Sequence, residues 1–283
     1  MSRRSTTGWI RFLLICASVL SVSPVYGLAG EVPAMSQSGS LVLLRVGPIR
    51  HGPIVATITR SRVVALSIDD GPDPRFTPAI LATLRAHAAR ATFFAVGANA
   101  IAHPELIRNE VRSGNEVANH TLDHPHLSRL GLAATRRELD LGRRALIAAG
   151  SPEPRLLRAP FGEFTPRLMR AAASRGELSV SWSLTVERAL DGRSIRAAVG
   201  WLMRRVRPGA ILLAHDGLLD RSRTVKALPL LLDQLVRRGY RVVTVSELLY
   251  ASGNLAVRRL LAPPIWHGHA VTTTGAGLRG PAA

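Results

Sequence analysis

Short apolar segments alternate with longer amphipathic ones along the middle of the chain, over residues 63–250. Adjoining apolar and β-branched residues are typical of buried strands, whereas apolar residues three or four apart are typical of helices. The pattern predicts seven strands, at residues 63–68, 91–96, 116–119, 156–158, 178–182, 210–214 and 241–245. It predicts helices at residues 77–88, 104–112, 133–149, 166–175, 194–205 and 225–238, and a short last helix through Tyr250.

This repeated order of strand and helix predicts a parallel sheet that is covered by helices. About seven such repeats in roughly 190 residues are typical of a distorted (βα) barrel, similar to a TIM barrel but short of its eight repeats. We therefore expect an α/β fold with a closed or nearly closed barrel. A doubly wound open sheet is the alternative.

Polar side chains interrupt the pattern just after several of the predicted strands. They are Asp69 and Asp70 after the first strand, His120 and His124 after the third, Arg158 at the end of the fourth, and His215 after the sixth. In a parallel barrel the carboxyl ends of all strands lie on one face, where binding and catalytic sites are built. Each residue alone has an ordinary structural explanation, but their joint occurrence at strand ends predicts a site.

The side chains in this set fit one kind of chemistry. One carboxylate and two imidazoles form a three-ligand site for zinc or a similar divalent ion, with positions left open for water and substrate. A second carboxylate can act as a base on water, and an arginine can hold that carboxylate ionised. A further histidine can protonate a leaving group. The set therefore predicts metal-assisted hydrolysis of an amide or an ester.

The sequence resembles the polysaccharide deacetylases with a NodB-homology domain (carbohydrate esterase family 4). The resemblance covers residues 63–249. Five segments resemble motifs or strands of that family in the same order, namely residues 67–72, 91–97, 116–124, 158–162 and 212–216.

The resemblance implies a role for each matching residue. Asp69 would be the catalytic base, Arg158 the residue that orients Asp69, and His215 the general acid. The metal ligands would be Asp70, His120 and His124. The backbone N–H of Phe161 would donate to the oxyanion, and Leu213 and Trp182 would line a pocket for the acetyl methyl group. The implied cofactor is one divalent ion, zinc first, with cobalt, manganese or nickel as alternatives. A water on that ion would attack an acetamide carbonyl and release acetate and a free amino sugar.

One motif departs from the family pattern. Thr185 and Arg188 stand where the family usually has aspartates that support the arginine and the acid histidine. A neutral threonine would not raise the pKa of His215 as a nearby carboxylate would. Glu187 could supply the missing carboxylate, although it points the same way as Thr185 only if the segment is extended.

The two ends of the chain differ from the middle. Arginines at positions 3, 4 and 11, an apolar run over residues 12–22 and small residues near position 29 predict a secretory signal at residues 1–29, with an uncleaved anchor as the alternative. We expect export to the periplasm or the extracellular space. Residues 30–62 are expected to be an extension, as a linker or as extra strands, and residues 251–283 a disordered tail.

The charge is strongly basic, with 37 lysines and arginines against 19 acidic residues and a net charge of +18. The basic residues are scattered and are not interleaved with aromatic residues, so we do not expect nucleic acid as a partner. Peripheral association with a membrane or an anionic cell-wall polymer through arginines fits this charge.

The sequence therefore predicts an exported, metal-dependent polysaccharide (N-acetylglucosamine) deacetylase, which removes N-acetyl groups from a cell-wall, capsular or exported polysaccharide or oligosaccharide. One alternative is a related hydrolase of another acyl or formyl amide on a sugar lipid. The other is a non-catalytic homologue that binds glycan.

Overall fold

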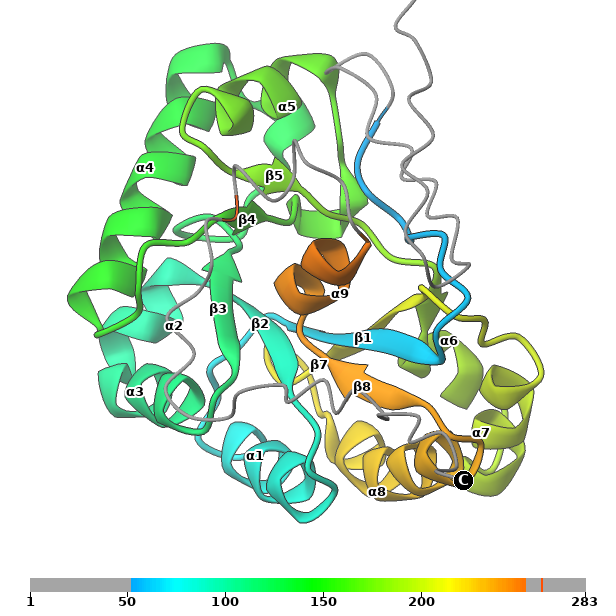
Figure 1. Cartoon of the computed structure of the whole chain (residues 1–283). Helices are drawn as coiled ribbons and strands as arrows, with labels where there is room; N and C mark the ends of the chain where they lie inside the picture. The colour runs from blue at the N-terminus through cyan, green and yellow to red at the C-terminus, as the bar shows by residue number, and fades with distance from the viewer. Residues whose placement is uncertain (1–51, 253–260, 262–283) are drawn as a thin grey trace, which may run out of the picture. The chain divides into compact units, whose positions relative to one another are not determined.

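The structure is a computed structural model that describes residues 52–252 and residue 261 (Figure 1). The predicted signal at residues 1–29, most of the predicted extension at residues 30–62 and nearly all of the predicted tail lie outside the described residues. Within the described part, no helix is both long enough and apolar enough to cross a bilayer.

One sheet of eight strands forms the centre of the described part, and all of its strand pairs are parallel (Figure 1). Its strands are β1 (Val63–Asp69), β2 (Ala91–Ala95), β3 (Glu116–Asn119), β4 (Leu156–Leu157), β5 (Leu178–Ser179), β6 (Leu184–Thr185), β7 (Ile211–His215) and β8 (Arg241–Val243). Their order is β5-β4-β3-β2-β1-β7-β6, and β8 pairs with β1. All seven predicted strands are present. The pattern missed β6, a strand of two residues that runs directly into α6.

The α-helices of the described part follow the predicted positions, with two additions. They are α1 (Thr77–Ala86), α2 (Gly97–Ala102), α3 (Pro104–Arg112), α4 (Leu132–Ala148), α5 (Pro166–Ala173), α6 (Val186–Leu190), α7 (Ile195–Met203), α8 (Ser222–Arg237) and α9 (Val245–Ala251). The sequence pattern missed α2 and α6, which are too short for a clear helical period. The last helix, α9, begins with a capping box between Thr244 and Glu247.

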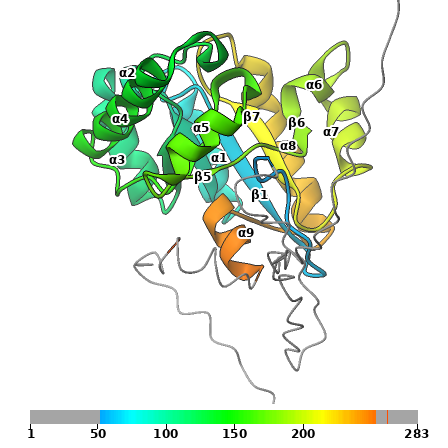
Figure 2. The ribbon, with the colours of Figure 1, turned by 90° about the horizontal axis from the view of Figure 1, so that it is seen from above.

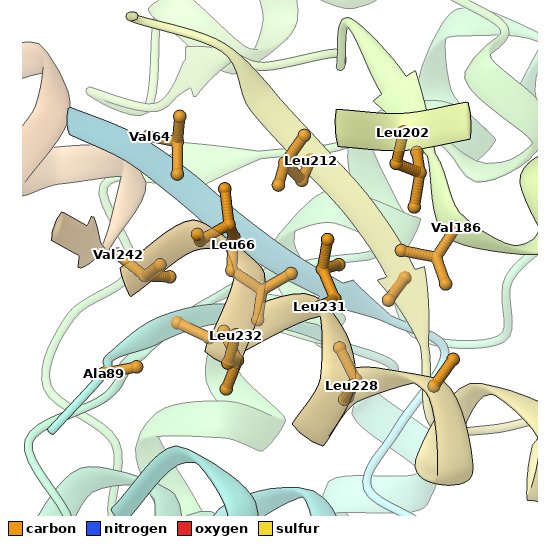
Figure 3. Close-up of a cluster of buried hydrophobic side chains, with 14 of the residues drawn as sticks. Val64, Leu66, Ala89, Val186, Leu202, Leu212, Leu228, Leu231, Leu232 and Val242 are labelled. Carbon is orange, nitrogen blue, oxygen red and sulfur yellow. The ribbon is translucent and has the colours of Figure 1, made fainter. Parts of the chain in front are cut away.

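The side chains of β1 alternate between two environments, and all seven of its residues are buried. Val64, Leu66 and Ile68 point outward, into a cluster with α1, α7 and α8, part of which Figure 3 shows. Burial on both faces is typical of a central strand in a helix-covered parallel sheet.

The opposite face of the sheet forms the inside of the barrel. Val63 and Ala65 of β1 contribute to a second apolar cluster there, with side chains from β2, β3, β4 and β7. Leu248 and Leu249 of α9 belong to the same cluster, and α9 lies at the end of the barrel away from α2 and α6 (Figure 2). A doubly wound sheet would have a full helix layer on this face as well. The packing therefore confirms the predicted distorted barrel.

The sheet ends at β5 on one side and β6 on the other, and a segment before β1 bridges part of this opening. Ile54 pairs with Val180 just after β5, and Ala56 pairs with Ala210 just before β7. The N–H of Ile54 donates to the carbonyl of Ser179 at 2.9 Å. Residues 54–57 thus lie along the opening and contact both sides of it through isolated β-bridges, without forming a strand.

Candidate active site

A cavity of about 450 Å³ opens where β1, β6 and β7 end. Eight of the nine site residues predicted from sequence line it, namely Asp69, Asp70, His120, His124, Phe161, Trp182, Leu213 and His215. The ninth, Arg158, lies directly behind Asp69. The fold therefore brings the whole predicted set together, from segments up to 146 residues apart.

Asp69 is held by the fully buried guanidinium of Arg158. The inward face of β1 changes from apolar to polar along the strand, so that Ser67 and Asp69 both face this arginine. Arg158 Nη1 donates to Asp69 Oδ1 at 2.6 Å and to Ser67 Oγ at 2.8 Å. Its Nε donates to the carbonyl of Val180 at 3.2 Å, and its Nη2 to that of Ser181 at 2.8 Å. One oxygen of Asp69 is thereby fixed, and Oδ2 stays on the side of the histidines.

The environment of Arg158 also accounts for part of the departure at Thr185. Backbone carbonyls and the Ser67 hydroxyl accept the hydrogen bonds that Asp69 does not. The guanidinium also lies over the ring of Phe94, 4.0 Å from its centroid. Arg158 therefore needs no second carboxylate to satisfy its donors.

Asp70, His120 and His124 form a three-ligand cluster. The Nε2 atoms of His120 and His124 lie 3.5 Å and 3.3 Å from Asp70 Oδ1, and the potential ligand atoms all lie within 4.8 Å of one another. His120 Nδ1 lies 2.8 Å from the carbonyl of Arg158, which fixes the tautomer with a free lone pair on Nε2. Two imidazoles and one carboxylate of this kind fit a divalent transition-metal ion.

The backbone of Asp70 has a left-handed conformation, with φ of 77°, that needs support from its neighbours. Asn99 Nδ2 donates to the carbonyl of Asp70 at 2.8 Å. Burial alone would raise the pKa of Asp70, but the contacts with His120 and His124 outweigh it and hold the pKa below its usual range. The cluster therefore keeps this carboxylate ionised and ready to bind a cation.

Arg221 is a member of the site that sequence reasoning missed. It is buried, its Nη2 donates to Asp70 Oδ2 at 3.1 Å, and its Nε donates to the carbonyl of Gly217 at 2.8 Å. The arginine thus orients the second oxygen of Asp70. Arg221 lies in the loop after β7, in a sequence with many other arginines. Its position five residues after Asp216 is the one feature that could have indicated a place in the site.

Gly217 allows this loop to approach the backbone of Asp70. A Cβ at this position would lie 2.1 Å from the Asp70 carbonyl oxygen, which belongs to a rigid turn. We expect Gly217→Ala to lower the free energy of unfolding by about 2 kcal/mol, because overpacking forces the backbone to shift. Chemical denaturation measures this change. Gly131→Ala is the matched control, since a Cβ there meets nothing within 4 Å, and an equal effect of the two substitutions would contradict the prediction.

Phe161 forms one wall of the cavity and has φ of 58°. The residue is 57% exposed, and its ring stacks on that of His126, with the centroids 3.9 Å apart. His126 Nδ1 lies 2.8 Å from Glu163 Oε1. Hydrogen bonds from Ser128 and His126 lower the pKa of Glu163 to about 2. His126, which had no role in the sequence analysis, therefore supports the ring of Phe161.

His215 lies at the end of β7, where it pairs in register with Asp69 of β1. Its ring Nδ1 is 3.0 Å from Glu187 Oε2. Glu187 lies in the helix α6 and not in an extended segment, and it still reaches the histidine. Arg188 is exposed on the same helix, and Thr185 lines the cavity without a charge.

Together, the barrel and the cluster place two carboxylates and three histidines at the carboxyl ends of the strands, in an arrangement that fits a hydrolase and that could hold a cation. The profile of the polysaccharide deacetylase family matches residues 56–178. A chitooligosaccharide deacetylase from Bradyrhizobium is 37% identical over 204 residues, which cover 68% of this chain and 92% of that protein. A peptidoglycan-N-acetylglucosamine deacetylase from Bacillus cereus is 35% identical over 189 residues, covering 66% of this chain and 88% of that protein.

The chain therefore belongs to the polysaccharide deacetylase family, and the predicted class of enzyme, a hydrolase, is confirmed. Its fold also resembles the crystal structure of a carbohydrate esterase family 4 pseudoenzyme from Bacillus anthracis. The TM-score is 0.65 with 27% identity, and the match covers 70% of this chain and 69% of that one.

Proposed function

We propose that this protein removes N-acetyl groups from amino sugars of a cell-wall, capsular or exported glycan, with one divalent ion held by Asp70, His120 and His124. The main support is that this triad lies beside the Asp69–Arg158 pair in one cavity. The names of the relatives support peptidoglycan and chitooligosaccharides as the two substrates to test first.

The protein groups divide the work of amide hydrolysis between them. An ion in the triad would polarise the acetamide carbonyl and make water more acidic. Asp69 accepts the proton of the attacking water at Oδ2, because Arg158 occupies Oδ1. His215, at the end of the neighbouring strand β7, donates a proton to the departing amine.

The remaining residues position the acetamide. The backbone N–H of Phe161 donates to the developing oxyanion, and the positive φ of this residue sets the direction of the loop. Leu213 and Trp182 line the cavity with apolar surface, which fits the acetyl methyl group. These roles agree with those that the family resemblance implies.

We expect chelation to stop acetate release and added zinc or cobalt to restore it. The mature protein, from about residue 31, is assayed on N-acetylglucosamine oligomers and on peptidoglycan, as purified, after chelation and after addition of metal. No acetate from either glycan, with one ion still bound per chain, would contradict the proposal. It would favour a hydrolase of another acyl amide, or a glycan-binding homologue.

Export remains part of the proposal, since such glycans lie outside the cytoplasm. Its support is the charged, apolar and small-residue pattern of the first 29 residues. Fractionation of the native host and N-terminal sequencing of the mature protein test it. A mature protein that begins at residue 1 in the cytoplasm would contradict it.

A further inference from the structure

We propose that Glu187 is the positioning residue for the acid His215, and that it replaces the aspartates that the family usually has at positions 185 and 188. The proposal rests on the deacetylase function proposed above and identifies a group that the family pattern does not place there. Its basis is a set of contacts between Glu187 on α6, His215 on β7 and Thr224 on α8.

One oxygen of the Glu187 carboxylate is fixed by two hydrogen bonds, and the other lies close to the ring of His215. Its Oε1 accepts from the backbone N–H of His215 at 3.0 Å and from Thr224 Oγ1 at 2.9 Å. Its Oε2 lies 3.0 Å from His215 Nδ1. Within the described residues, neither Oε2 nor Nδ1 makes a hydrogen bond, so their approach is an ion-pair contact without hydrogen-bond geometry. The carboxylate therefore holds the backbone of the histidine and lies against its ring.

This arrangement determines which ring nitrogen serves catalysis. With Nδ1 only 3.0 Å from Glu187 Oε2, Nε2 is the nitrogen left for the leaving amine. Burial lowers the pKa of His215, but Glu187 more than compensates and the pKa is raised, with Asp69 and Asp70 acting in the same direction. Glu187 therefore favours the protonated ring that a general acid requires.

Neither of the two substituted family positions provides this contact. Thr185 pairs in register with Leu213 on β7, so it lies next to the strand of His215 but has no charge. Arg188 is exposed. Glu187 is the next acidic residue after Thr185 in the chain, and the turn of α6 carries it to the histidine. The carboxylate beside His215 thus comes from position 187 in this chain, and not from position 185 or 188.

Two substitutions at this position separate the charge of Glu187 from its hydrogen bonds. Glu187→Gln removes the charge and keeps an acceptor, whereas Glu187→Ala removes both. For N-acetylglucosamine oligomers we expect kcat to fall about 10-fold and about 100-fold respectively, with KM changed little, because general acid assistance acts in the transition state. The surface variant Glu105→Gln is the control and should keep the wild-type kcat.

An aryl acetate ester provides a readout that a purely structural role would not change. Its phenolate leaving group departs without a proton from His215, whereas an amine requires one. We therefore expect the Glu187 variants to lose much less activity on p-nitrophenyl acetate than on the acetamide. Parallel losses on both substrates in a folded variant would overturn the proposal, and so would an unchanged kcat on the acetamide.

Moving the carboxylate back tests the same point by rescue. In the double variant T185D/E187A, an aspartate on β6 faces the neighbouring strand of His215, and we expect it to recover part of the lost kcat. No recovery in a folded double variant would mean that the exact place of the carboxylate on α6 is required, which contradicts the replacement proposed here.

A spectroscopic measurement keeps this inference separate from the proposed function. In protein labelled with ¹⁵N-histidine, the wild-type His215 ring should show a protonated Nδ1, and Glu187→Ala should lose this preference. The result does not depend on finding the natural substrate. An Nδ1 signal that is the same in both proteins would overturn the positioning role, even if deacetylation is confirmed.

Discussion

Asp69→Asn is expected to reduce the kcat for deacetylation by about 1,000-fold and to leave metal binding intact. An amide cannot accept the proton of the attacking water, and removal of a general base typically costs a factor of 10² to 10⁴. The proposed cation ligands Asp70, His120 and His124 are unchanged by the substitution. Steady-state acetate release gives the rate, and isothermal titration with zinc gives the affinity.

Asp123→Asn is the matched control for this substitution. Asp123 lies between the two ligand histidines in sequence, but it is exposed. It should therefore keep the wild-type rate. If Asp69→Asn kept more than about a tenth of the wild-type kcat, Asp69 would not be the base. If it lost the metal as well, its role would be that of a ligand.

Arg158→Met is expected to lower the free energy of unfolding by about 3–5 kcal/mol. Arg158 is fully buried, and it donates to Asp69, to Ser67 and to two backbone carbonyls. Methionine fills much of the space but leaves Asp69 as a buried carboxylate without its cation, and breaking a buried ion pair in this way costs several kcal/mol. Denaturation in urea, followed by circular dichroism, measures the change.

A surface arginine provides the comparison for Arg158. Arg143 forms an ion pair with Glu153 that remains partly open to solvent. Arg143→Met should cost about 1 kcal/mol or less, as is usual for such pairs. Equal losses for the two substitutions would show that the buried network around Asp69 contributes nothing beyond an ordinary surface pair.

The predictions from sequence succeeded where the information is local. The buried strand β1 follows from an unbroken run of apolar residues, and the position of Asp69 and Asp70 directly after it follows from the same run. His120 and His124 are close in sequence and meet at Asp70. Because the carboxyl ends of parallel strands share one face, these local patterns were sufficient to predict the triad and its neighbours.

Contacts that depend on the direction of a single side chain were not predictable in this way. Glu187 reaches His215 because α6 turns immediately after β6, and a helix of five residues leaves no clear periodic pattern. Arg221 reaches Asp70 across 151 positions of sequence, through a loop with no motif of its own. The sequence named Glu187 as a candidate carboxylate, but its spacing from Thr185 did not show that it reaches His215. Nothing in the sequence pointed to Arg221 as a partner of Asp70.

The sequence by itself determined the order of strands and helices, the α/β class and the set of groups at the strand ends. Only the tertiary structure decided that the sheet curls into a barrel with α9 inside one end and residues 54–57 along its opening. It also decided which carboxylate supports His215. The physical reason is that hydrophobic periodicity specifies which face of an element is buried, whereas the partner of a buried polar group depends on how distant segments pack.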